Sequence, residues 1–252
     1  MAGAVLEFIG VGKRFAPGAP VLEDFTLAVS PEETVALVGP SGSGKTTALK
    51  LANRLLDADS GEVRVFGEPV RAPEPAALRR RIGYVIQEGG LFPHWSVREN
   101  VETVPRLLGW PEEKRRARAE ALLETVGLPP GEFSARLPRE LSGGQRQRVG
   151  VARALAADPP LVLMDEPFGA LDPIARRAIQ REFLAWKRSL SAAVLFVTHD
   201  LAEAFRLADR IAVLHRGHIR QVGTPDDLRR RPADAFVREF VQDFVEPAET
   251  AT

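Results

Sequence analysis

A glycine-rich loop between an apolar run and a helix-forming run constrains the fold more than any other part of the sequence. The run Val35–Val38 predicts a buried strand, GPSGSGKT follows at residues 39–46, and residues 47–56 predict a helix. Glycines let a backbone curl around a phosphate group, and the N-terminus of the following helix attracts an anion. The pattern is G-x-x-x-x-G-K-[ST] in a strand–loop–helix setting, which predicts a nucleoside triphosphate site rather than a chance glycine-rich turn.

The chemistry of a polyphosphate gives several residues of this loop a role. Lys45 can bridge the β- and γ-phosphates, and the Thr46 hydroxyl can bind Mg²⁺. The glycines leave room for backbone N–H groups to converge on the phosphates. The residues of this stretch expected to bind the nucleotide are Gly39, Ser41, Gly42, Gly44, Lys45, Thr46 and Thr47.

The composition narrows the class of protein. The 252 residues are 44% hydrophobic, which is enough for a large α/β core. Lys+Arg and Asp+Glu both number 34, so the charge balance gives no electrostatic case for a nucleic-acid partner. The absence of cysteine excludes disulfides and thiolate metal sites. The sequence has no signal-peptide pattern and no apolar run approaching about 18 residues, so we expect a soluble protein.

Strand and helix patterns alternate along the chain, which predicts an α/β fold with a mostly parallel sheet. The first strands predict an antiparallel β lobe, and residues 88–154 predict an inserted helical subdomain. We expect one domain over residues 1–252, with a C-terminal helical extension at about 225–252. The expected strands are 6–11, 21–29, 35–38, 61–66, 81–87, 161–164, 193–197, 211–214 and 218–222. The expected helices, besides 47–56, are 96–108, 111–127, 149–157, 200–208, 233–244, a short one from Thr224-Pro225 and one that Asp172 caps before Pro173.

Two further stretches carry residues suited to nucleotide chemistry. Asp165 and Glu166 follow a fully apolar strand, where one carboxylate can hold Mg²⁺ and the other can deprotonate a water molecule. Asp165 suits the first role and Glu166 the second. The sequence LSGGQ at residues 141–145 places a serine and two glycines at a helix start, the form of a second anion site. By itself it is equally a glycine-rich N-cap.

The LSGGQ stretch matches letter for letter the signature of ATP-binding-cassette (ABC) ATPases, and the other motifs follow in that family's order. Residues 39–46 resemble its Walker A motif, and Asp165 with Glu166 resembles its Walker B motif and the glutamate that follows it. Gln87 resembles the Q-loop glutamine, and GALD at 169–172 resembles the D-loop. His199, in FVTHD, resembles the switch histidine. Phe15 stands where the family has an aromatic residue that stacks on adenine.

The resemblance implies a P-loop NTPase cassette that binds ATP and Mg²⁺ and hydrolyses ATP. It also implies a head-to-tail dimer, in which each ATP lies between the phosphate loop of one subunit and LSGGQ of the other. The catalytic residues it implies are Glu166, His199, Lys45 and Gln87. The nucleotide contacts it adds are Phe15, Ser142, Gly143, Gly144, Gln145 and Asp172. The metal contacts it implies are Thr46, Gln87 and Asp165.

Shorter stretches resemble the ATPase subunits of importers for glycine betaine, choline and related osmoprotectants. They are Asn53-Arg54-Leu55 and YVIQEGGLFPHWSVREN at residues 84–100. This resemblance implies a cytoplasmic protein at the inner face of the membrane, with permease subunits as partners and a substrate-binding protein as an indirect one. Leu91, Phe92 and Trp95 are candidates for the permease contact, and packing inside the helical subdomain is the alternative.

Other ABC systems remain alternatives to an osmoprotectant importer. They are an exporter, an importer of a different substrate, and an ATPase acting on nucleic acid or ribosomes. The neutral charge and the lack of sustained heptads between Thr46 and Ser142 argue against the last of these. The sequence leaves the transported substrate open, because a cassette does not touch it.

Overall fold

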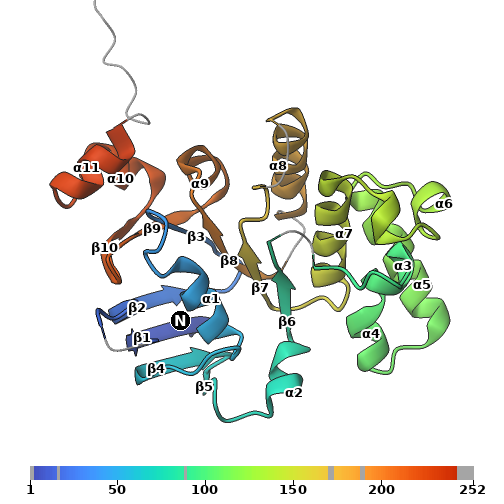
Figure 1. Cartoon of the computed structure of the whole chain (residues 1–252), viewed down its shortest axis with the longest axis horizontal. Coiled ribbons are helices and arrows are strands. Elements are labelled where there is room, and N and C mark those ends of the chain that lie inside the picture. Colours follow the sequence, from blue (N-terminus) through green and yellow to red (C-terminus); the bar gives the residue numbers. More distant parts are fainter. Residues whose placement is uncertain (1–2, 16–17, 88–89, 170–172, 188–190, 243–252) are drawn as a thin grey trace, which may run out of the picture. The chain divides into compact units, whose positions relative to one another are not determined.

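Two compact units make up the part of the chain that the computed structural model describes, which is residues 3–15, 18–87, 90–169, 173–187 and 191–242. The first unit combines residues 1–70 with 195–252, and the second is residues 71–194. Figure 1 shows their helices and strands.

The first unit contains an antiparallel sheet in the order β2-β1-β4-β5. Along β2, Phe25, Leu27 and Val29 are buried and Thr26 is exposed, as the alternating sequence predicts. The expected antiparallel lobe is therefore confirmed. Its strands are β1 (Leu6–Lys13), β2 (Leu22–Val29), β4 (Ser60–Val65) and β5 (Glu68–Pro69).

A second sheet of the first unit carries the phosphate loop. Its strand β3 (Thr34–Val38) pairs in parallel with β9 (Arg210–His215), and β8 (Ala193–Thr198) lies on the other side of β3. Strand β10 (His218–Gly223) forms an antiparallel hairpin with β9. All residues of β3 are buried, as is typical of a parallel strand covered on both faces.

Four stretches of the first unit are helical in the described residues: α1 (Lys45–Ala52), α9 (Leu201–Leu207), α10 (Pro225–Arg230) and α11 (Ala235–Val241). The helix expected at 47–56 instead runs from Lys45 to Ala52. It ends before Arg54 because that residue has a left-handed φ of +48°, which a right-handed helix cannot include. On α11, Phe236 stacks on His215 at the end of β9 with ring centroids 3.8 Å apart, so this helix packs on the unit.

The second unit pairs β6 (Ile82–Val85) in parallel with β7 (Leu161–Asp165), with Ile82 opposite Leu161. Helix α7 contacts α3, α5 and β6, so it lies at the centre of the helical part. The helices of this unit are α2 (Pro75–Arg79), α3 (Val97–Val101), α4 (Thr103–Leu107), α5 (Glu112–Thr125), α6 (Pro130–Phe133), α7 (Gly143–Leu155) and α8 (Pro173–Lys187), with a 3-10 turn at Pro138–Glu140.

The prediction of one helix at 96–108 is wrong in one respect. The helix begins with a capping box, in which Ser96 Oγ accepts from Glu99 N at 3.2 Å and Glu99 Oε2 accepts from Ser96 N at 2.7 Å. However, the helix is interrupted at Glu102. Pro105 explains the break, since it has no N–H group to donate to the carbonyl of Val101. The short helix α6 is not among the helices expected from the sequence.

Across the described ranges, no helix is both long enough and apolar enough to cross a membrane.

Candidate functional site

The phosphate loop connects β3 to α1 in the first unit. At Gly39, φ is +154° and an added Cβ would lie 2.0 Å from the Leu214 carbonyl oxygen, so only glycine fits there. Lys45 is only 8% exposed, and its Nζ donates to the carbonyl oxygens of Gly39 at 2.7 Å and Pro40 at 2.9 Å. The fold therefore holds a buried ammonium group inside the loop.

The loop fits the triphosphate that the sequence predicts. Within the part of the chain that the structure describes, the buried Ser43 Oγ has no hydrogen-bond partner. An unsatisfied buried hydroxyl costs about 1–3 kcal/mol, and a phosphate oxygen would satisfy it. Helix α1 begins at Lys45, so Thr46 lies in its first turn, where N–H groups lack intrahelical partners. Both features suit a directly bound anion.

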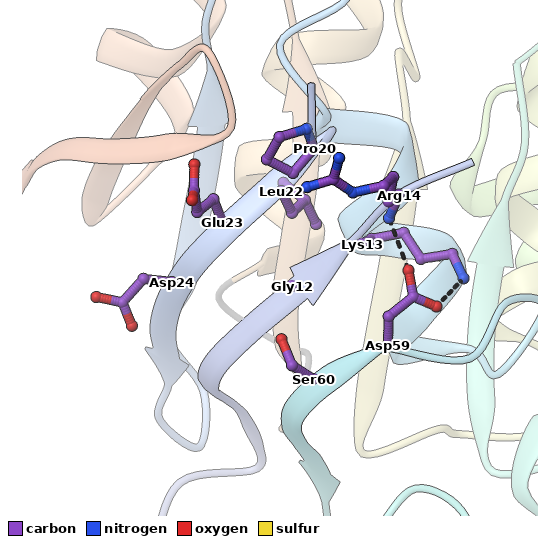
Figure 2. Close-up of a pocket in the computed structure, with 9 residues that line it drawn as sticks. All are labelled: Gly12, Lys13, Arg14, Pro20, Leu22, Glu23, Asp24, Asp59 and Ser60. Carbon is purple, nitrogen blue, oxygen red and sulfur yellow. Dashed lines mark hydrogen bonds and ion pairs between the residues drawn. The ribbon is translucent and has the colours of Figure 1, made fainter. Parts of the chain in front are cut away.

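An exposed aromatic residue, Phe15, precedes the phosphate loop in the sequence. Phe15 is 59% exposed, and Lys13 Nζ lies 5.7 Å from the centre of its ring. The Asp59 carboxylate accepts from Lys13 Nζ at 2.8 Å and from Arg14 N at 2.7 Å, and these bonds hold the pKa of Asp59 below its usual value. Lys13 and Arg14 also line a pocket of about 180 Å³ (Figure 2). Its other lining residues are Gly12, Pro20, Leu22, Glu23, Asp24, Asp59 and Ser60. The ring offers a flat face to a nucleotide base.

The expected switch histidine also belongs to the first unit. His199 is exposed and directly follows β8, the strand beside β3 in the sheet. Its neighbours Thr198 and Asp200 are hydrogen-bonded to each other, since Asp200 N donates to Thr198 Oγ1 at 3.0 Å. The end of this strand therefore presents the imidazole from a fixed backbone.

In the second unit, Asp165 ends the apolar strand β7 and is 5% exposed. Burial and the nearby charge of Asp165 together raise the pKa of Tyr84, on the adjacent strand β6, to about 12. The Tyr84 phenol therefore stays neutral and keeps its proton. A buried carboxylate at a strand end is a suitable ligand for Mg²⁺.

Glu166 has a strained backbone. Its φ is +45°, a left-handed conformation that costs a non-glycine residue about 1–3 kcal/mol. Gln87 Nε2 donates to Glu166 Oε2 at 3.2 Å, so folding brings together two of the predicted catalytic residues. Strain of this kind gathers at functional sites, because it aims a side chain that a relaxed backbone would not.

The LSGGQ stretch forms the start of α7. Ser142 Oγ accepts from Gln145 N at 3.2 Å, and Gln145 Oε1 accepts from Ser142 N at 2.8 Å. The serine and glutamine are thus a capping box, the simpler interpretation that the sequence left open. The Ser142 proton can still be donated, and the N–H groups of Gly143 and Gly144 lie in the first turn. A capping box and an anion site are therefore compatible here.

The segment after Gln87 displays apolar side chains. Phe92 is 45% exposed, and its ring centroid lies 4.6 Å from that of Trp95. Leu107 and Leu108 are 57% and 43% exposed. Arg106, the residue before Leu107, lies 5.7 Å from the centre of the Trp95 ring. We call Phe92, Leu107 and Leu108 the apolar patch. A patch of exposed apolar side chains in one unit is a candidate protein contact.

Asn100 holds this segment in shape. It is fully buried, and its Nδ2 donates to the carbonyl oxygens of Phe92, Trp95 and Ser96 at 3.2, 3.1 and 3.0 Å. Its Oδ1 accepts from Phe92 N at 2.7 Å. Asn100 is not among the residues predicted from the sequence, because nothing in the sequence marks an asparagine that closes a loop through backbone groups.

The predicted site residues divide between the two units. The first unit holds Phe15, the phosphate loop and His199, and the second holds Gln87, Asp165, Glu166 and residues 142–145. Asp172 lies outside the described residues.

The chain is similar to a family model and to known proteins. The family model described as ABC transporter matches residues 22–169. The glycine betaine/carnitine/choline transport ATP-binding protein OpuCA of Bacillus subtilis is 51% identical over 94% of this chain and 62% of its own length. The glycine betaine uptake system ATP-binding protein YehX of Escherichia coli is 48% identical over 94% of this chain and 76% of its own.

A solved structure is also similar. The ATP-binding cassette MJ0796, a dimer in a post-hydrolysis state with ADP and phosphate, has a TM-score of 0.79 and is 32% identical over 87% of this chain and 98% of its own. The chain spans less than two thirds of the length of the Bacillus relative. The fold class expected from the sequence is confirmed by this likeness. The family model and the Escherichia relative together show that the chain belongs to the ABC transporter family.

Proposed function

We propose that the chain is the ATP-binding and ATP-hydrolysing subunit of an importer for osmoprotectants such as glycine betaine or choline. The observation that carries the hydrolytic part is the hydrogen bond from Gln87 to the strained Glu166, one residue after the buried Asp165. The names of the Bacillus and Escherichia relatives support the class of substrate.

The phosphate loop binds ATP. Lys45 exchanges its bonds to loop carbonyls for bonds to the β- and γ-phosphates, and Ser43 gains a partner. Phe15 stacks on the adenine ring. Thr46, Gln87 and Asp165 would hold Mg²⁺, which when bound neutralises charge on the phosphates.

Hydrolysis needs a base and groups that stabilise the γ-phosphate. Glu166 accepts the proton of the attacking water, with Gln87 orienting its carboxylate. His199 donates to the γ-phosphate. Ser142 of a second copy donates to the same phosphate, with the Gly143 and Gly144 amides beside it, while Gln145 keeps the serine in its cap. Asp172, which lies outside the described residues, is a further proposed contact of the nucleotide.

The protein that this ATPase subunit drives is a membrane permease. The chain works at the inner face of the membrane, docked on cytoplasmic segments of the permease through the apolar patch, and a substrate-binding protein acts only through that permease. Closing of the dimer on ATP is transmitted through the segment after Gln87, which Asn100 holds rigid.

Uptake in a deletion strain tests the importer. Deleting this chain should abolish high-affinity uptake of labelled glycine betaine or choline and leave uptake of a labelled polyamine unchanged. Wild-type protein should restore uptake, and Lys45→Met should not, because it removes the ammonium that binds the phosphates. Unchanged uptake of both osmoprotectants, or efflux lost instead of uptake, would contradict the proposed transport.

Removing one side chain of the apolar patch tests the permease contact. Phe92→Ser should lower permease-stimulated ATP hydrolysis and uptake about tenfold, as for a central aromatic residue of an interface, and leave basal hydrolysis by the isolated chain unchanged. Leu55→Ser is the matched control, because Leu55 is 46% exposed but lies in the other unit. Equal losses in both variants would show that the patch is not the contact.

A further inference from the structure

A buried carboxylate that the proposed mechanism does not use lies close to His199 in the chain. Glu203, on α9, is 3% exposed, and Thr198, the last residue of β8, is 2% exposed. Thr198 Oγ1 donates to Glu203 Oε2 at 2.7 Å and accepts from Asp200 N at 3.0 Å. Burying polar groups costs free energy unless they are hydrogen-bonded, and here they bond to each other.

This network encloses the backbone of His199. Thr198 precedes the histidine and Asp200 follows it, and the Thr198 hydroxyl joins the two. Asp200 Oδ1 also accepts from Glu203 N at 3.3 Å, which closes a ring through α9. The ring restrains the dihedral angles on both sides of His199, whose side chain is exposed.

Strand β8 does not need the Thr198 hydroxyl, and the N-cap of α9 does not need the Glu203 carboxylate. Strand β8 is otherwise apolar and buried, so a valine would continue it with nearly the same shape. The side chain of Asp200 alone caps α9. The Thr198 hydroxyl instead accepts from Asp200 N, the backbone group directly after His199, and the Glu203 carboxylate orients that hydroxyl by accepting its hydrogen bond.

We infer that Thr198 and Glu203 are positioning residues that hold the backbone of His199, so that its imidazole reaches the γ-phosphate without reorganisation. The inference rests on the proposed role of His199. A misplaced donor loses much of its stabilisation of the transition state while ATP binding by the phosphate loop is unaffected, so the effect falls on kcat.

The test is a double-mutant cycle on the full chain, with kcat and KM for ATP and the melting temperature measured for each variant. Thr198→Val should lower kcat about tenfold with KM within about twofold of wild type, and Thr198→Ser, which keeps the hydroxyl, should restore it. Once His199→Ala has removed the imidazole, Thr198→Val should change kcat by less than about twofold, because the network acts through that side chain.

Each outcome decides a different point. If His199→Ala lowers kcat but Thr198→Val does not, or if the two losses multiply in full, the positioning inference is wrong and the proposed function stands. If His199→Ala leaves kcat unchanged, the role of His199 fails. Should Thr198→Val not fold, Glu203→Met removes the acceptor of the Thr198 hydroxyl at similar side-chain volume, and an unchanged kcat in it overturns the inference.

Discussion

Glu166→Gln is expected to lower ATP hydrolysis by about a hundredfold or more and to trap a dimer with ATP bound. The amide cannot accept a proton from the attacking water, yet it has the volume of the carboxylate. Its oxygen can still accept the hydrogen bond that Gln87 donates, so the strained geometry of residue 166 is retained. The phosphate loop is untouched, and binding therefore continues while the chemical step stops.

Two measurements check this result. Size-exclusion chromatography with ATP should show a dimer for Glu166→Gln and a monomer after the nucleotide is removed, and a steady-state assay gives the hydrolysis rate. Glu132→Gln is the matched control, because Glu132 is an exposed acid on α6 that pairs with Arg136. Hydrolysis by Glu166→Gln at the wild-type rate would show that another group is the base.

The sequence predicts those parts of the fold whose causes are local. Strands β3, β7 and β8 are recognisable because each is an apolar run bounded by turn or polar residues, and each is buried along its whole length. The phosphate loop is recognisable for a chemical reason, since close contact with phosphates dictates its glycines and its lysine. The capping box at Ser96 depends on two residues three positions apart, which the sequence shows directly.

Other parts of the site depend on contacts that only the folded chain creates. The left-handed backbone of Glu166 has no marker in its residue type, because glutamate is not a residue that favours positive φ. The loop that Asn100 closes and the network of Thr198 and Glu203 each join side chains to backbone groups brought together by a turn. The break at Glu102 has a local cause that the sequence does show, namely Pro105. The prediction of one continuous helix is wrong because it follows the helical periodicity and does not take Pro105 into account.

Mixing two inactive variants should restore activity if the site is shared between subunits. Lys45→Met removes the charge that binds the phosphates. Ser142→Asp keeps a good N-cap on α7 but places a carboxylate against the γ-phosphate of the partner's ATP. Each variant alone should hydrolyse ATP at less than about a hundredth of the wild-type rate.

In the mixed dimer, one phosphate loop with Lys45 faces one α7 with Ser142, and both substitutions lie at the other site. If subunits pair at random, half of the dimers are mixed and each has one intact site, so an equal mixture should reach about a quarter of the wild-type rate. Ser142→Asn is the control for the cap, since it is neutral and should retain more activity than Ser142→Asp. A signature that acted on the phosphates of its own chain would leave the mixture inactive, because every chain would then carry one damaged half of its own site.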